Sequence, residues 1–149
     1  MEFSSAPGRI GWIDLTVPEA TKVRDFYRDV VGWTSESLSF GEYDDYVMTP
    51  PGAETPIAGV CHARGSNASV PPVWLIYVNV PDLDASLAKC VACGGSIVDG
   101  PRSMGGMGQF AAIQDPAGAT IGLFQHTSSP LNTPYYPLRQ EPLPCSHAS

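Results

Sequence analysis

Two stretches of the chain, "IDLTVPEATKVRDFYRDVVGW" at residues 13–33 and "IYVNVPDLDASLAKCVACGGS" at residues 76–96, are built on one plan. Each starts with apolar residues, passes through a Val-Pro-acid step and reaches glycine near its end. The offset between them is 63 residues (76 − 13), and the same offset places "IAGVCH" at 57–62 on "TIGLFQ" at 120–125. An offset that holds at both ends of a unit indicates a duplicated module.

Each copy predicts the same order of secondary structure. Alternating apolar residues predict opening strands at residues 9–17 and 73–80. Proline and an acid in the first turn, followed by an apolar stripe, predict helices at 18–31 and 81–94. Turn residues then separate three short strands in each half, which we expect at 34–40, 44–49 and 56–62, and at 96–99, 108–114 and 119–125. The predicted fold class is α+β, with two βαβββ modules in tandem.

The repeat also sets the expected domain organisation, a single domain with a tail at each end. Its parts are an N-terminal tail at 1–8, module one at 9–62, a connector at 63–72, module two at 73–126 and a Pro-rich C-terminal tail or arm at 127–149. We expect the arm to be partly ordered, because its leucines and tyrosines would be costly to leave exposed to water.

The bulk properties exclude several classes of function. The 149 residues carry a net charge of −7, which argues against binding to nucleic acid or to an anionic membrane surface. No apolar run is long enough to span a bilayer, and the first residues lack the pattern of a secretory signal. We therefore expect a cytoplasmic protein with no nucleic acid or membrane partner.

Period-two geometry divides the side chains of each opening strand between two faces. In the first strand Ile13, Leu15 and Val17 form a uniform face that suits packing against a helix. The opposite face mixes aromatic, acidic and amide side chains in both copies, as the wall of a ligand pocket does. The candidate ligand-binding residues on that face are Trp12, Asp14, Gly59, Leu75, Tyr77, Asn79, Gly122 and Phe124.

Asp14 is the most informative of these residues. A carboxylate in an apolar wall is suited to act as a general base or to hold a ligand, so Asp14 is also the candidate catalytic residue. The alternative is a structural carboxylate that bonds to neighbouring backbone or to a tyrosine. Gly59 and Gly122 likewise leave two interpretations open, space for a ligand or close packing of the strands.

Two further expectations concern the first module. The apolar stripe of its helix should consist of Val23, Phe26, Tyr27 and Val30. The acidic and aromatic stretch at 43–46 should lie mostly at a solvated edge, with Tyr46 or Met48 reaching inward.

The motifs and the repeat together resemble those of a known family. The paired modules, "FYRDVVGW" at 26–33 and "GQFAAIQDPAGATIGLFQ" at 108–125 are similar to the vicinal oxygen chelate superfamily, which includes glyoxalase I, extradiol dioxygenases, and bleomycin and fosfomycin resistance proteins. The resemblance implies an open, curled sheet around a cavity, with the helices outside. It also implies a homodimer, since family members with one pair of modules commonly dimerise.

The resemblance bears on metal binding as well. Metal-using members of the family carry ligands at positions that correspond here to Trp12, Gly59, Leu75 and Gly122, and none of these side chains binds a divalent metal. The motif W-x-D-L at residues 12–15 resembles a branch that lacks the ligands. We therefore expect no metal and no cofactor.

Three hypotheses about function follow. The first is a metal-free protein that binds a small organic molecule in the central cup. The second is a metal-free enzyme that uses Asp14 as an acid or base. The third is a metal-dependent lyase or dioxygenase with relocated ligands.

Overall fold

The computed structural model of the protein describes residues 6–39, 43–65 and 68–127. Its first half contains β1 (Ile10–Val17), α1 (Ala20–Val31), β2 (Thr34–Ser39), β3 (Asp44–Thr49) and β4 (Ala58–His62). Its second half contains β5 (Leu75–Asn79), α2 (Leu83–Ala92), β6 (Ser96–Ser103), the short 3-10 helix η2 (Gly105–Met107), β7 (Gly108–Gln114) and β8 (Thr120–His126). The order of elements confirms the predicted fold class, an α+β fold with two βαβββ modules.

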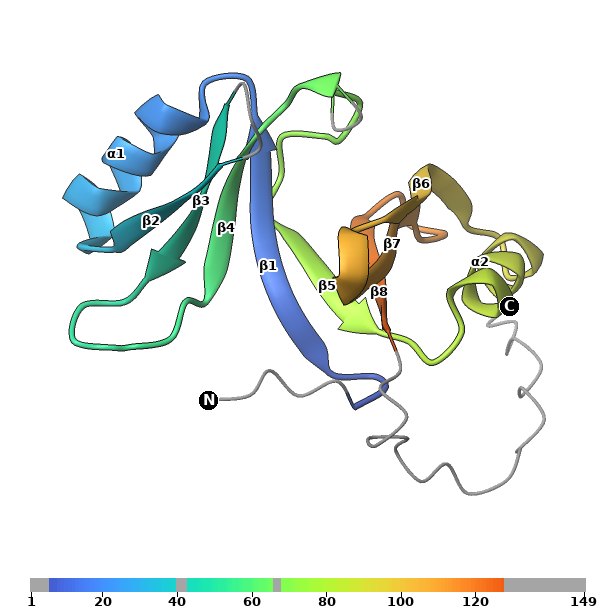
Figure 1. The fold of residues 1–149 in the computed structure, drawn as a ribbon. Helices are drawn as coiled ribbons and strands as arrows, with labels where there is room; N and C mark the ends of the chain where they lie inside the picture. The colour runs from blue at the N-terminus through green and yellow to red at the C-terminus, as the bar shows by residue number, and fades with distance from the viewer. Residues whose placement is uncertain (1–5, 40–42, 66–67, 128–149) are drawn as a thin grey trace.

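All eight strands form one sheet in the order β2-β3-β4-β1-β5-β8-β7-β6. The sheet curls, and α1 and α2 lie beside its opposite ends (Figure 1). The opening strands β1 and β5 meet antiparallel at the centre, and each pairs in parallel with the last strand of its own module, β1 with β4 and β5 with β8. This arrangement brings the first strands of the two modules side by side.

The strand register reproduces the sequence repeat. Asp14 lies opposite Gly59 in the pair β1–β4, and Tyr77 lies opposite Gly122 in the pair β5–β8. Both residues of the second pair are 63 positions after those of the first. The duplicated sequence has therefore produced a duplicated register.

The predicted elements agree closely with the observed ones, apart from β6. This strand was expected to end at residue 99, but it continues to Ser103 because Arg102 and Ser103 pair with Phe110 and Gln109 of β7. The first helix ends at Gly32 as expected, in the left-handed conformation with φ of 76° that glycine adopts without strain.

Three buried clusters form the core. The cluster beneath α1 contains Ala20, Tyr46, Met48, Ala58 and Val60. The cluster beneath α2 contains Leu83, Leu87, Ala111 and Leu123. The third lies on the opposite side of the sheet, which we call the helix-free face, and contains Leu75, Tyr77, Phe110, Ala112 and Phe124, with Trp12 packed against it. The predicted division of the strands into two faces is thus confirmed for these residues.

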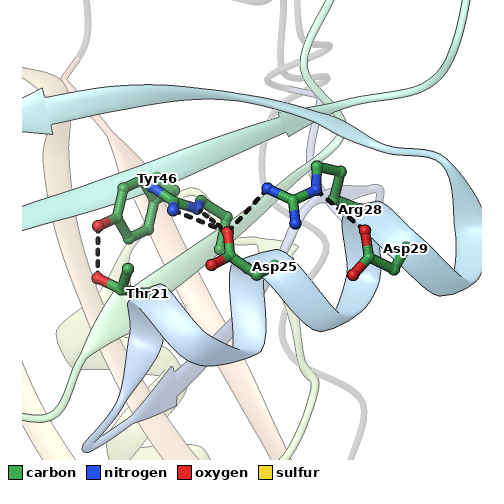
Figure 2. A network of polar contacts seen from close by, with 6 residues as sticks. Thr21, Asp25, Arg28, Asp29 and Tyr46 are labelled. Carbon is green, nitrogen blue, oxygen red and sulfur yellow. Dashed lines mark hydrogen bonds and ion pairs between the residues drawn. The ribbon is translucent and has the colours of Figure 1, made fainter.

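The predicted apolar stripe of α1 is wrong in part. Val23 packs against the core and Tyr27 is partly buried, whereas Phe26 and Val30 are 55% and 61% exposed. Polar residues take part in the docking of the helix instead, because Thr21 and Tyr46 share a hydrogen bond of 2.6 Å between their hydroxyl groups (Figure 2).

The same network extends along α1. The Arg24 guanidinium lies 4.5 Å from the centre of the Tyr46 ring and donates hydrogen bonds to Asp25 at 2.7 and 2.9 Å. Asp25 also accepts a hydrogen bond from Arg28, which pairs with Asp29 (Figure 2). A cation over an aromatic ring is attracted to its face, so Tyr46 anchors β3 from the helix side.

Some expectations lie outside the described residues. The C-terminal arm predicted at 127–149 lies beyond them apart from Thr127, and the homodimer stays a prediction. Within the described ranges, no helix is long and apolar enough to cross a membrane.

A candidate ligand-binding site on the helix-free face

The centre of the helix-free face is built by the two opening strands. Trp12 lies directly opposite Tyr77, and Asp14 lies opposite Leu75. Because β1 and β5 are antiparallel, Asp14 and Tyr77 are diagonal neighbours on this face, within reach of a long side chain. The expected residues Trp12, Leu75, Tyr77 and Phe124 therefore come together.

Two members of this wall, Phe110 and Ala112, were not among the expected residues. They alternate with the helix-facing Ala111 along β7 and pack with Tyr77 and Phe124. The same period-two argument that was applied to the opening strands, extended to residues 108–114, would have found them.

The two glycines of this face are covered by aromatic rings of the chain itself. A methyl group at Gly122 would lie 2.6 Å from Cε1 and 2.9 Å from Cγ of Tyr77. At Gly59 it would lie 3.4 Å from Nε1 and Cζ2 of Trp12, and 3.2 Å from Cβ of Asp14. Each glycine, because it has no side chain, thus lets one aromatic ring lie close to the backbone. That ring fills the space beside the glycine.

Asp14 is buried, with 6% of its surface exposed, and within the described part of the chain its Oδ1 atom has no hydrogen-bond partner. Burial raises the pKa of its carboxyl group from 3.8 to about 7, while a hydrogen bond from the Tyr77 side chain lowers the pKa and the charge of Asp45 raises it. The carboxyl group is therefore close to half protonated at neutral pH.

The groups beside Asp14 stay protonated at neutral pH. Burial and the negative charge of Asp14 raise the pKa of the Tyr77 hydroxyl far above its ordinary value. Burial, together with the charges of Asp14 and Asp45, does the same for the pKa of the Cys61 thiol. Cys61 lies opposite Thr16 in the register, two pairs further along from Asp14 and Gly59. The site consequently combines one titrating acid with weak neutral donors.

Asp45 is the acidic neighbour that the sequence did not reveal. Asp45 is only 7% exposed, so the expected solvated edge is wrong at this position. The reason is that β3 lies between β2 and β4 and is not an edge strand. Tyr46 and Met48 are buried, which confirms the expectation that one of them reaches inward. Asp45 Oδ1 accepts a hydrogen bond of 2.7 Å from the backbone N–H of His62 and lies 3.6 Å from His62 Nδ1.

Asn79 lies at the end of β5, and its side chain contacts other residues of the protein. It is 2% exposed, its Oδ1 lies 3.1 Å from His126 Nε2, and its Nδ2 lies 3.5 Å from the backbone oxygen of Ala6. These contacts join β5 to β8 and to the N-terminal segment. Asn79 therefore holds one end of the site together and makes polar contacts of its own.

A second carboxylate, Asp99 of β6, is directed toward the same face. The register runs from Asp99 to Ala112, Gly122 and Tyr77 across three strand pairs. Asp99 pairs with Arg102 and accepts a hydrogen bond of 3.3 Å from Ser69, but among the described residues its Oδ2 has no hydrogen-bond partner. The charge of Asp99 raises the pKa of Tyr77, so Asp99 interacts electrostatically with the centre of the site.

The residues at the family's metal positions do not fit a metal ion. Trp12 and the ring over Gly122 fill the space with aromatic carbon, and Leu75 is an aliphatic side chain that is 1% exposed. Within the described ranges there is also no group of three or more His, Cys, Asp or Glu side chains that could hold a metal ion.

Comparison with known proteins assigns the family. The profile of the Glyoxalase/Bleomycin resistance protein/Dioxygenase superfamily matches residues 9–123, and the chain belongs to this superfamily. Among curated proteins it is similar to the "Putative glyoxylase CFP32" of Mycobacterium bovis, with 30% identity over 119 residues that make up 79% of this chain and 46% of that protein. It is also similar to the anthracycline biosynthesis protein DnrV of Streptomyces peucetius, with 27% identity over 131 residues, 80% of this chain and 48% of that protein.

The solved structures support the fold. A methylmalonyl-CoA epimerase from Streptomyces coelicolor superimposes with a TM-score of 0.52 at 15% identity, covering 83% of this chain and all of the other. At that identity the likeness concerns the fold alone. The chain spans about half the length of the curated relatives that it matches.

Proposed function

We propose that this protein is a metal-independent member of its superfamily that binds a small organic molecule at the helix-free face, with Asp14 as the polar contact. One observation carries the proposal, namely the buried Oδ1 atom of Asp14 without a hydrogen-bond partner among the described residues. A buried acceptor that is left unsatisfied costs about 1–3 kcal/mol. A hydrogen-bond donor on a ligand would satisfy this oxygen, and none of the described residues does so.

The surroundings of Asp14 support this function. Trp12, Tyr77, Phe110 and Phe124 form an aromatic wall, and binding sites for organic molecules are mostly apolar walls with few polar groups. The names of the two curated relatives, a glyoxylase and a protein of anthracycline biosynthesis, both refer to the chemistry of small organic molecules. A strongly shifted carboxyl group in such a wall is a candidate for a functional site.

The proposal is tested by metal analysis and ligand screening of the same preparation. Protein purified without chelator should contain no stoichiometric zinc, iron, nickel or manganese, and should still bind aromatic fragments in NMR experiments that observe the Trp12 indole N–H. Asp14→Asn should weaken the binding, whereas Asp84→Asn, which removes the same charge from an exposed position of α2, should not. Fragment binding that strictly requires an added metal ion would contradict the proposal.

A second candidate function is acid-base catalysis by Asp14. The observation that favours it is the pKa of about 7, because a general acid or base is most effective when its pKa is near the working pH. Any turnover found for a bound fragment should then be lost in Asp14→Asn and should titrate near pH 7 in the wild type. Turnover that persists in Asp14→Asn would leave binding as the function of this residue.

A further inference from the structure

We infer that the molecule bound at the helix-free face carries a protonated amine on an aromatic body, with the ammonium group on Oδ1 of Asp14 and the rings against Trp12 and Tyr77. This inference rests on the proposed function and names the chemistry of its ligand. It follows from the charges that face Asp14, from the aromatic wall, and from the Oδ1 atom of Asp14, which has no hydrogen-bond partner in the described ranges.

In the part of the chain that the structure describes, the ionisable groups that interact with Asp14 are Asp45, Cys61 and Tyr77, and all three are acids. Asp45 faces it from β3, Cys61 from β4 and Tyr77 from β5, and a further carboxylate, Asp99, acts on Tyr77 from β6. The charged group that acts on the Asp14 carboxyl group is therefore another negative one, Asp45. An anionic ligand would meet repulsion here, and a cation would meet two carboxylates.

Three basic side chains on elements near the site already have acidic partners. Arg102 pairs with Asp99, and the His62 ring lies beside Asp45 and 2.7 Å from the backbone oxygen of Asp44. Arg24 pairs with Asp25 on the other side of the sheet. None of these three side chains is a ready partner for a ligand carboxylate. They therefore do not cancel the preference of the acidic groups for a positively charged ligand.

The geometry of the Asp14 carboxyl group also favours a donor. Tyr77 supplies a hydrogen bond to the carboxyl group, and Oδ1 stays without one among the described residues. An ammonium group is a donor only, and its hydrogen bond to a carboxylate is about twice as strong as a neutral one. A bound cation would also keep Asp14 ionised, which removes the cost of burying the charge alone.

The aromatic wall supplies the rest of the contact. Trp12 and Tyr77 are the rings nearest to Asp14 in the register, and Phe110 and Phe124 extend the wall along β7 and β8. Ring faces attract cations, tryptophan most strongly, and they stack on flat organic groups. A cationic aromatic molecule uses both the acids and the rings, whereas a purely aliphatic amine would use only the acids.

The test compares matched triplets of aromatic fragments that differ only in one group, an amine, an alcohol or a carboxylate. Tryptamine, tryptophol and indole-3-acetate form one such triplet, and larger triplets with two and three fused rings extend the series. Dissociation constants are measured by NMR titration of the full chain at pH 7.5. We expect the amines to bind best, and to bind Asp14→Asn about tenfold more weakly or worse, with Asp84→Asn unchanged.

A second readout does not depend on the folding of a variant. In the wild type, a saturating amine should lower the pKa of the Asp14 carboxyl group by one unit or more, measured from its carbon chemical shift against pH, because the cation favours the ionised form. A neutral alcohol bound at the same place should not produce this shift.

The outcomes separate the two levels of the argument. Alcohols or carboxylates that bind better than amines, with loss of binding in Asp14→Asn, would overturn the cationic ligand and leave the proposed function intact. Absence of binding by every member of the series at millimolar concentration would overturn both. Amines that bind equally well to wild type and Asp14→Asn would show attraction by the net negative charge alone, and would overturn the inference.

Discussion

Equivalent positions of the two modules carry different chemistry on one shared sheet. With the offset of 63 residues, Asp14 of module one corresponds to Tyr77 of module two, and Trp12 corresponds to Leu75. Both modules keep a glycine at the next strand, Gly59 or Gly122. The backbone of the duplicated unit was kept, and the side chains that meet at the centre became different.

This difference makes the site asymmetric. Module one contributes the titrating acid and a second acid, Asp14 and Asp45, while module two contributes most of the aromatic wall. A ligand that must satisfy Asp14 on one side and stack on rings on the other has one preferred orientation. A symmetric pair of modules would have offered two equal orientations.

The helices show the same divergence. Ala20 and Leu83 are equivalent, and both are fully buried. About one helical turn further on, the equivalent residues are Arg24 in α1 and Leu87 in α2. Arg24 lies over the Tyr46 ring, whereas Leu87 is 5% exposed in an apolar cluster. The docking of α1 includes a cation on a ring, whereas the equivalent position of α2 is packed by aliphatic side chains.

The largest expected effect comes from the asymmetric acid. The folded-state pKa of Asp14 is about 7 against 3.8 ordinarily, so the folded protein holds a proton that the unfolded chain releases. The free energy of unfolding should therefore fall as the pH rises from about 4 to about 7, by about 4 kcal/mol, and then level off. Urea unfolding of wild type and Asp14→Asn at each pH should show the variant gaining relative stability over this range.

Asp84→Asn provides the control for this titration, because it removes a carboxylate of the same kind from an exposed position. A stability difference between wild type and Asp14→Asn that stays constant from pH 4 to pH 8 would mean that the carboxyl group is not perturbed by burial. The asymmetry between Asp14 and Tyr77 would then be one of shape and not of charge.

The helix pair gives the next largest difference. Leu87→Ala should lower the free energy of unfolding by about 2–5 kcal/mol, since it leaves a cavity in a packed cluster. Arg24→Ala should lower it by about 1 kcal/mol, because the side chain is partly exposed and loses mainly a cation–ring contact. Chemical denaturation at one pH measures both. Equal losses would show that the two helices are docked with equal strength despite their different contacts.

The two glycines are expected to differ by a smaller amount. Gly122→Ala places a methyl group against Cδ1 of the Tyr77 ring and 2.6 Å from its Cε1, inside any allowed contact, and should lower the free energy of unfolding by about 2–3 kcal/mol. Gly59→Ala meets Trp12 at 3.4 Å and Asp14 Cβ at 3.2 Å, and should cost about 1 kcal/mol. Thermal unfolding of the two variants decides the order. A greater loss of stability in Gly59→Ala would mean that the ring of module one, Trp12, packs more tightly on its glycine than Tyr77 does.

Much of the fold followed from the sequence, because a period of two and a constant offset are properties of residue order alone. The opening strands, both helices, and the equivalence of Asp14 with Tyr77 and of Gly59 with Gly122 followed from the repeat, and the strand register repeats at the same offset. Alternation also placed Trp12 and Tyr77 on one face. These features depend on local geometry that each strand carries with it.

The features that were missed depend on contacts between distant segments. Asp45 looked like a surface acid because its neighbours in sequence are polar, and only the placement of β2 beyond β3 buries it. Phe26 looked like a core residue because its spacing fits a helix stripe. The contacts of Thr21 and Arg24 instead turn a different side of α1 toward the sheet. The pairing order of strands and the rotation of a helix are not written in local periodicity.

The smallest expected effect concerns the hydrogen bond that joins the two modules at the site. Tyr77→Phe removes the donor that lowers the pKa of Asp14, so that pKa should rise above about 7, as followed by the carboxyl carbon shift in an NMR titration. The free energy of unfolding at pH 8 should fall by about 1 kcal/mol, the usual net worth of one hydrogen bond. The ring of Phe would still cover Gly122, so a change confined to the titration, with the fold retained, isolates the hydroxyl group. An unchanged pKa in Tyr77→Phe would mean that burial and Asp45 alone set the acidity of Asp14, and that module two contributes only its rings to the site.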